Sequence, residues 1–132
     1  MRGTCHCGAV CWTLADRPDC ATACSCSLCR RYGTLWAYGY EGHGVRLDGD
    51  VTAYARADAS DPMLDVLFCR TCGCVAAWRG RGTDQDGRRR MAVNLRLAEP
   101  EEVADIEVEH LNALHSFEDF TFDDRRVRDM WF

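Results

Sequence analysis

Three cysteines lie within six residues of the chain, at Cys24, Cys26 and Cys29. Side chains alternate between two faces in an extended segment, so Cys24 and Cys26 point the same way, and a turn through Ser27 and Leu28 brings Cys29 back toward them. Zinc binds thiolates in a tetrahedron, and three protein ligands leave the fourth position to water or substrate. Disulfides or small buried residues are the alternatives. The spacing, together with a second group of cysteines, favours a metal site of the catalytic type.

Two arginines, Arg30 and Arg31, follow the third cysteine directly. Three thiolates on a divalent cation leave one net negative charge, and an adjacent guanidinium would lower thiolate pKa values and attract an anionic ligand. A solvated pair of surface arginines is the other interpretation. The sequence leaves both open.

A second group begins with the pair in Cys69-Arg70-Thr71-Cys72-Gly73. Two cysteines three positions apart fit one metal ion on a tight turn, and Gly73 can adopt the positive φ that such a turn needs. The pair requires two more ligands, and Cys5 and Cys7 are the natural complement across 61 intervening residues (69 − 7 − 1). A four-thiolate site of this kind closes a long loop, so we expect its loss to unfold the domain.

Three of the ten cysteines remain outside these two groups. Cys11 and Cys74 adjoin predicted apolar strands and are most simply small core residues. Cys20 is an alternative fourth ligand for the group at positions 24–29. A fourth ligand would make that site structural rather than catalytic.

The composition limits the class of protein. A chain of 132 residues with 47% hydrophobic content is expected to form one globular domain, residues 1–132. Its net charge of −5 argues against a general nucleic-acid binder. The N-terminus lacks an apolar run and no stretch is long enough for a membrane span, so we expect a cytoplasmic protein whose cysteines stay reduced. All 16 basic residues are arginine, which excludes a catalytic lysine.

The elements that must position the cysteines are mostly short strands. Alternating apolar residues predict a strand at 10–14, with Val10, Trp12 and Leu14 inward, and a strand-knuckle-strand unit over 63–78. We also expect a hairpin over 45–55 that turns at Asp48-Gly49. Beyond these, the pattern predicts a strand at 91–97, a short helix from Pro100 to Ala104 or Asp105, a strand at 106–111, and an aromatic segment from His115 to Phe132 that packs across the sheets.

Other side chains are candidates for contact with a substrate. The aromatic strand with Trp36, Tyr38 and Tyr40 could form the roof of a pocket over the metal, or it could be core on a half-buried sheet. The arginine-rich loop 79–90 could hold the carboxylates of a small anion, although a solvated loop is the default. His110 and His115 are candidates for proton transfer only if they fold back near the metal.

The ordered motifs resemble those of the glutathione-dependent formaldehyde-activating (GFA) or CENP-V-like family. They are the segments 3–10, 24–31 with Gly33, 68–73 and 93–96, and the order of seven cysteines is specific. The resemblance implies a mainly β, Mss4-like (β-tent) fold of several small coiled antiparallel sheets around two zinc sites, with one short helix. It also implies that Cys5, Cys7, Cys69 and Cys72 hold a structural zinc ion, and that Cys24, Cys26 and Cys29 hold a catalytic one.

The founding activity of that family condenses glutathione with formaldehyde and is classed as a carbon-sulfur lyase. The leading hypothesis is that a thiol such as glutathione and a small aldehyde meet at the open site, with Arg30, Arg31 and Trp36 contacting the substrate. A zinc-stabilised binding module and a redox sensor are the alternatives. A homodimer is compatible with the sequence.

Overall fold

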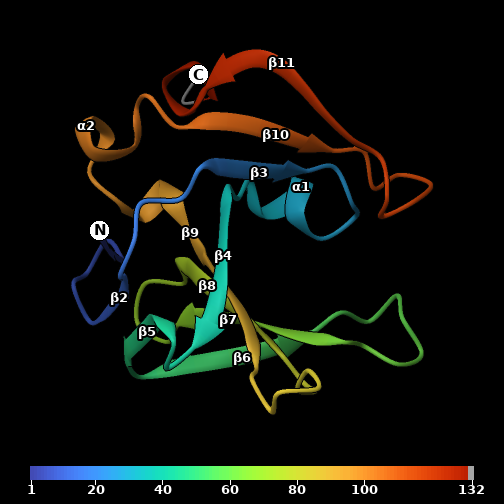
Figure 1. Cartoon of the computed structure of the whole chain (residues 1–132). Coiled ribbons are helices and arrows are strands. Elements are labelled where there is room, and N and C mark those ends of the chain that lie inside the picture. The colour runs from blue at the N-terminus through green and yellow to red at the C-terminus, as the bar shows by residue number, and fades with distance from the viewer. Residues whose placement is uncertain (131–132) are drawn as a thin grey trace.

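The computed structural model describes residues 1–130, and the fold is mainly β, as predicted (Figure 1). The helical turns are α1 (Cys29–Tyr32), α2 (Pro100–Val103) and two 3₁₀ turns at Leu95–Leu97 and Val127–Met130. The strands are β1 (Arg2–Thr4), β2 (Val10–Leu14), β3 (Cys20–Cys24), β4 (Trp36–Glu41), β5 (Gly44–Gly49), β6 (Val51–Ala55), β7 (Leu64–Cys69), β8 (Val75–Gly80), β9 (Arg90–Asn94), β10 (Glu107–Leu111) and β11 (Phe120–Arg126).

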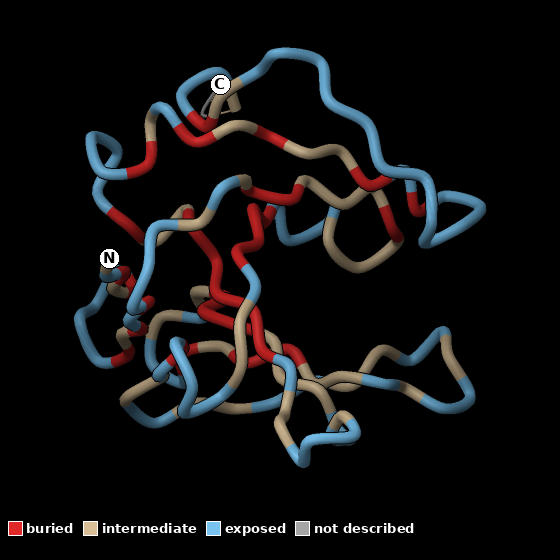
Figure 2. The backbone as a smooth tube through the Cα atoms, in the orientation of Figure 1, coloured by how far each residue is buried: buried red, intermediate tan, exposed pale blue. Residues whose placement is uncertain are grey.

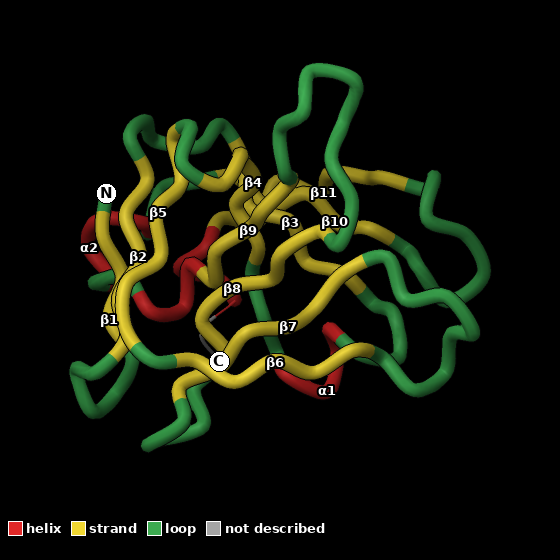
Figure 3. Tube along the Cα trace, turned by 90° about the horizontal axis from the view of Figure 1, so that it is seen from below, coloured by secondary structure: helices red, strands yellow, loops and turns green. Residues whose placement is uncertain are grey.

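The strands pair into one open, strongly bent path. Its order is β1-β2-β5-β4-β9-β8-β7-β6, while β3 joins β4 to β10 and β10 pairs with β11. The β4–β5 and β3–β10 pairs are parallel and the others are antiparallel. In Figure 1, β3, β10 and β11 form an upper layer, and β4 and β9 run down to the lower layer, where β6, β7 and β8 lie side by side (Figure 3).

The core lies where β2, β4 and β9 meet, and Figure 2 shows the buried segments running through the middle of the molecule. The predicted alternation in β2 is confirmed, since Val10, Trp12 and Leu14 are all buried. Trp12 packs with Leu35 and Val93 in the largest cluster of buried side chains. Burial of these apolar surfaces is the main stabilising term, and it ties the N-terminal strands to the middle of the chain.

The packing of Gly3 against Trp12 predicts a stability effect. A Cβ atom at Gly3 would lie 2.3 Å from atoms of the Trp12 ring, which cannot move within a filled core. We expect Gly3→Ala to lower the free energy of unfolding by about 1–3 kcal/mol, measured by urea denaturation. The matched control is Gly82→Ala, because a Cβ at Gly82 meets nothing within 4 Å. Equal stability losses in the two variants would contradict the packing argument.

The hairpin predicted at Asp48-Gly49 is wrong. Strand β5 pairs with β2 and β4, whereas β6 pairs with β7, so the two segments do not face each other. Gly49 has φ 110°, and a Cβ there would lie 2.2 Å from the carbonyl oxygen of Ala9. A glycine is therefore needed here because the backbones of β5 and the start of β2 approach closely, not because the chain forms a two-residue turn.

The prediction of a strand through Leu97 is also wrong beyond Asn94. Buried Asn94 accepts hydrogen bonds at its Oδ1 from the backbone N–H groups of Leu35 (3.3 Å) and Arg96 (3.2 Å). The bond to Arg96 closes a 3₁₀ turn at Leu95–Leu97, which ends the strand. The predicted helix after Pro100 is present as α2, and α1 is a second short helix.

The aromatic residues near the C-terminus do not pack across the sheets as predicted. Phe117, Phe120 and Phe122 are exposed, because β11 is the outer strand of its layer and pairs only with β10 among the described residues. The segment instead covers the core through Val127, which is fully buried. Trp131 and Phe132 lie outside the described residues.

Candidate metal centres and the adjoining pocket

The structure brings Cys24, Cys26 and Cys29 together as the spacing predicts. Their sulfur atoms lie within 4.8 Å of one another. Cys24 ends β3, Cys26 is in the following turn, and Cys29 begins α1. The backbone N–H of Cys29 donates a hydrogen bond to the Cys26 sulfur (3.4 Å). The helix lasts one turn and stops at Gly33, which takes the left-handed conformation that suits glycine. The result is a compact group of three ligands.

Two contacts hold the turn that carries these cysteines. The Ser25 N–H donates to the carbonyl oxygen of Leu111 (3.0 Å), and the Ala113 N–H donates to the Ser25 hydroxyl oxygen (2.9 Å). Leu28 packs into two buried clusters, one with Trp36 and one with Leu111. The three-cysteine group is therefore fixed from both sides.

Trp36 contacts the three-cysteine group from within a buried cluster. It is only 2% exposed, and its indole Nε1 donates a hydrogen bond to the Cys29 sulfur (3.3 Å). Such a bond orients a thiolate and stabilises its charge. Contact between Trp36 and a substrate stays a prediction.

This bond predicts weaker metal binding when the indole donor is removed. We expect Trp36→Phe to lower the affinity of the three-cysteine group for zinc about tenfold, within the usual range for the loss of such a partner. Zinc transfer to a chromogenic chelator measures it. Trp78→Phe is the control, since Trp78 packs in the same cluster and stacks edge-on with Tyr38. An unchanged affinity in Trp36→Phe would show that the bond does not support the ligand.

The three thiols share their protons unequally. Hydrogen bonds from Cys24 and Cys29 lower the pKa of Cys26. Hydrogen bonding to Cys24 and Cys26 raises the pKa of Cys29, and hydrogen bonding to Cys26 raises that of Cys24. Cys24 and Cys29 therefore hold their protons more tightly than Cys26 does. A divalent cation would displace the remaining protons, so its binding weakens as the pH falls.

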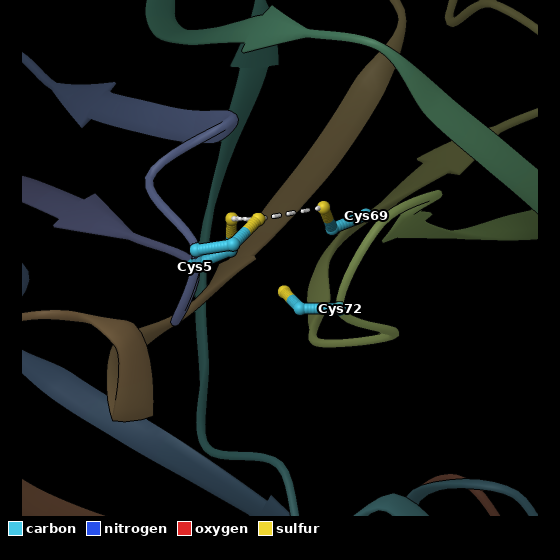
Figure 4. A group of neighbouring side chains, drawn as sticks. Cys5, Cys69 and Cys72 are labelled. Carbon is cyan, nitrogen blue, oxygen red and sulfur yellow. Dashed lines mark hydrogen bonds between the residues drawn. The ribbon is translucent and has the colours of Figure 1, made fainter.

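The second group joins Cys5, Cys7, Cys69 and Cys72, again as predicted. Figure 4 shows the sulfurs of Cys5, Cys69 and Cys72 converging from two turns of the chain, one after β1 and one between β7 and β8. The Cys7 sulfur lies 3.6 Å from those of both Cys5 and Cys69. Zinc–sulfur bonds of about 2.3 Å in a tetrahedron place sulfurs about 3.8 Å apart, so the group has the dimensions of a closed four-thiolate site.

Backbone N–H groups point at these sulfurs. The Val10 N–H donates to Cys5 (3.2 Å) and the Thr71 N–H donates to Cys69 (3.4 Å). Backbone hydrogen bonds, first that from Cys74, lower the pKa of Cys72 to about 5. The turn between β7 and β8 therefore stabilises the thiolates of Cys69 and Cys72. At Cys7, by contrast, a backbone hydrogen bond from Ala9 is outweighed by burial and by hydrogen bonding to Cys69, which raise the pKa of Cys7 to about 12.

The other three cysteines stay outside both groups. In the pairing of β3 with β10, Cys20 lies opposite Glu107 and Cys24 lies opposite Leu111, so the two cysteines are at opposite ends of β3. Cys20 as a fourth ligand is therefore wrong, because the strand holds the two sulfurs too far apart. Cys11 and Cys74 were expected in the core but are both only half-buried, and Cys74 packs beside the four-cysteine group.

A pocket of about 340 Å³ adjoins the three-cysteine group. It is lined by Cys26, Ser27, Arg30, Arg56, Asp58, Ala113, Leu114, His115 and Phe117. Arg30 thus lies where a substrate could reach it, whereas Arg31 turns back and donates to the Ser27 carbonyl oxygen (2.5 Å). Of the two histidines that were candidates for proton transfer, His115 borders the pocket, whereas His110 is hydrogen-bonded to Asp123 (3.1 Å). Arg56 and Asp58 also line this pocket, although no sequence motif marks either residue as part of a site.

The arginine-rich loop 79–90 joins β8 to β9 away from this pocket. Its cations are occupied by nearby groups: Arg79 and Arg89 face Glu41, and Arg81 pairs with Asp65. Arg88 pairs with two aspartates of the loop itself, and Arg90 lies over the Tyr38 ring. The loop is a solvated hairpin whose arginines pair with acidic or aromatic neighbours, most of them outside the loop.

The sequence profile of the family described as glutathione-dependent formaldehyde-activating enzyme matches residues 1–108. The chain belongs to the GFA family. A crystal structure of a Rhodobacter sphaeroides protein is 30% identical to this GFA-family chain, with a TM-score of 0.57, and the similarity covers 75% of this chain and 88% of that one. No curated protein matches the sequence. Among residues 1–130, no helix has the length and apolar character needed to cross a membrane.

Proposed function

We propose that this GFA-family protein is a zinc-dependent enzyme that joins a thiol such as glutathione to formaldehyde or another small aldehyde. In class it is a carbon-sulfur lyase of the S-(hydroxymethyl)glutathione synthase type. One observation carries the proposal. One cysteine group offers four ligands and the other offers three, and it is the three-cysteine group that borders a pocket. A closed site suits structure and an open site suits chemistry.

Both groups fit zinc in the nature of their donors. Every ligand is a thiolate sulfur, which favours zinc over hard cations such as magnesium or calcium. When bound at the three-cysteine group, zinc supplies a Lewis acid with an open position, which lowers the pKa of a thiol.

The residues around the group have three tasks in this reaction. Trp36 fixes Cys29 through its hydrogen bond, and Leu28 holds the turn against the core. Arg30 at the pocket draws in a thiol that carries a negative charge. The addition forms one carbon–sulfur bond and moves the thiol proton to the carbonyl oxygen, so it needs no oxidant. The gain comes from bringing the two reactants together with the sulfur ionised.

The test is the rate of adduct formation between glutathione and formaldehyde, measured by NMR exchange spectroscopy with and without zinc-loaded protein. We expect the protein at micromolar concentration to accelerate exchange above the spontaneous rate. Protein that carries two zinc ions and leaves exchange unchanged for both formaldehyde and larger aldehydes would contradict the proposal.

A zinc-stabilised binding module is the second candidate. The exposed side chains of Phe120 and Phe122 on the outer strand β11, and of Phe117 in the loop before it, favour this candidate, since exposed aromatic groups are suited to contact with a partner. In that case both metal sites would be structural. Protein in which cobalt replaces zinc would then show no spectral change when a thiol is added.

A further inference from the structure

The pocket beside the three-cysteine group has walls from three separate parts of the chain. The turn 26–30 forms one, the loop after β6 forms a second, and the segment 113–117 after β10 forms the third. In Figure 1 the loop after β6 and the loop after β10 project to the same side of the molecule as α1. A ligand in the pocket therefore touches residues that are far apart in sequence.

The turn 26–30 and the loop after β6 together carry one positive charge without a partner among the described residues, on Arg30. Arg56 makes a two-bond ion pair with Asp58, at 2.6 Å and 2.9 Å, and also donates to the Ser27 hydroxyl oxygen (3.0 Å). Ser27 in turn donates to Asp58 (2.5 Å), so these three side chains satisfy one another. The side chain of Arg30 has no hydrogen-bond or ion-pair partner within residues 1–130. Arg30 is the group left to meet an anion.

The wall formed by segment 113–117 is mainly apolar and open to solvent, and His115 is its one polar lining residue. Leu114 is 61% exposed and Phe117 is 57% exposed, whereas Ala113 is buried in a cluster with Cys26 and Leu111. Large apolar side chains at the edge of a pocket lose contact with water when an apolar ligand group covers them. Ala113, Leu114 and Phe117 all follow position 108, where the match to the family profile ends. This wall therefore belongs to the part of the chain that the family pattern does not describe.

We propose that the pocket selects a thiol that carries both a carboxylate and an apolar group, the carboxylate facing Arg30 and the apolar group covering Leu114 and Phe117. The proposal rests on the proposed function, because it assigns the thiol substrate of the same site. A purely polar thiol would leave the apolar wall in water, and a purely apolar one would leave Arg30 without a partner. The two walls make Phe117 the residue that determines specificity.

The test uses protein in which cobalt replaces zinc, because a thiol that reaches the three-cysteine group changes the cobalt charge-transfer bands. Three probes separate the walls: 2-mercaptoethanol carries neither feature, mercaptoacetate carries the carboxylate, and 2-mercapto-3-phenylpropanoate carries both. We expect mercaptoacetate to bind about threefold tighter than 2-mercaptoethanol, the usual scale of an exposed ion pair. The phenyl group should tighten binding about tenfold more.

Two variants with matched controls assign the walls. Phe117→Ala should weaken binding of 2-mercapto-3-phenylpropanoate about tenfold and leave mercaptoacetate unchanged, whereas Phe122→Ala, equally exposed but outside the pocket, should change neither. Arg30→Gln should remove the threefold preference for the carboxylates, and Arg46→Gln on β5 should not. All four positions are exposed, so the fold should survive each change.

The outcomes separate this inference from the proposed function. If no thiol changes the cobalt spectrum, the proposed function and the inference both fail. If all three probes change it with equal affinity, or if Phe117→Ala and Phe122→Ala behave alike, the inference alone is overturned and the open thiol site stands. The inference is supported if affinity rises from 2-mercaptoethanol through mercaptoacetate to 2-mercapto-3-phenylpropanoate, and if Phe117→Ala but not Phe122→Ala weakens binding of the last probe.

Discussion

Replacing Cys69 by serine is expected to unfold the domain. Cys69 is one of four sulfurs that join the turn after β1 to the turn between β7 and β8, and its contact with Cys7 spans 62 positions of the chain. Binding of a structural zinc ion contributes about 10–16 kcal/mol in small domains, which matches or exceeds the whole stability of about 5–15 kcal/mol. Losing one of four thiolates removes much of it. Far-ultraviolet circular dichroism and the metal content of the purified variant measure the loss.

The control for this change is Cys11→Ser. Cys11 is a half-buried cysteine on β2 that belongs to neither metal group, so its replacement tests the cost of the chemical change alone. We expect Cys11→Ser to fold and to keep two metal ions. A folded Cys69→Ser variant with wild-type melting behaviour would show that the four-cysteine group does not hold the fold together.

Replacing Cys29 by serine should have the opposite pattern, with activity lost and the fold kept. The change removes one of only three ligands, and it also removes the sulfur that accepts the indole hydrogen bond of Trp36. We expect the zinc content to fall from two ions per chain to one. The rate of thiol–aldehyde exchange should fall about a thousandfold or to the spontaneous rate, since loss of a Lewis acid costs several kcal/mol and each 1.4 kcal/mol is a factor of ten.

Cys20→Ser is the matched control, because Cys20 lies at the far end of the strand that carries Cys24. It should keep both metal ions and full activity. Full activity in Cys29→Ser would exclude the three-cysteine group as the catalytic site. A variant that loses activity and also unfolds would show that the group is structural.

The metal groups could be predicted from the sequence because most of their geometry is local. The alternation of an extended segment followed by one turn brings Cys24, Cys26 and Cys29 together within six positions, and the turn between β7 and β8 does the same for Cys69 and Cys72. The partners of Cys69 and Cys72 are distant in sequence, so Cys5 and Cys7 could be assigned to them only by counting the remaining cysteines and by the resemblance to the family. The alternating burial of β2 was predictable for the same reason, since it depends only on a period of two.

The pocket could not be predicted because its walls meet only in three dimensions. Nothing near Arg56 or Asp58 in the sequence points to Ser27, yet these three side chains are bonded to one another beside the three-cysteine group. The predicted turn at Gly49 was wrong for a related reason, since a glycine is needed there to leave room for the Ala9 carbonyl oxygen just before β2. The exposure of Phe120 and Phe122 depends on the position of β11 at the edge of its layer, which the pattern of apolar residues does not state.

The different spans of the two cysteine groups imply an order of metal loading during synthesis on the ribosome. All the ligands of the three-cysteine group have been made once Cys29 is added, whereas the four-cysteine group waits for Cys69 and Cys72. The 43 residues from Cys29 to Cys72 (72 − 29) take about 2–9 s at the usual rate of about 5–20 residues per second. During that interval the nascent chain presents the three-cysteine group to the cell's metal ions before the four-cysteine group is complete.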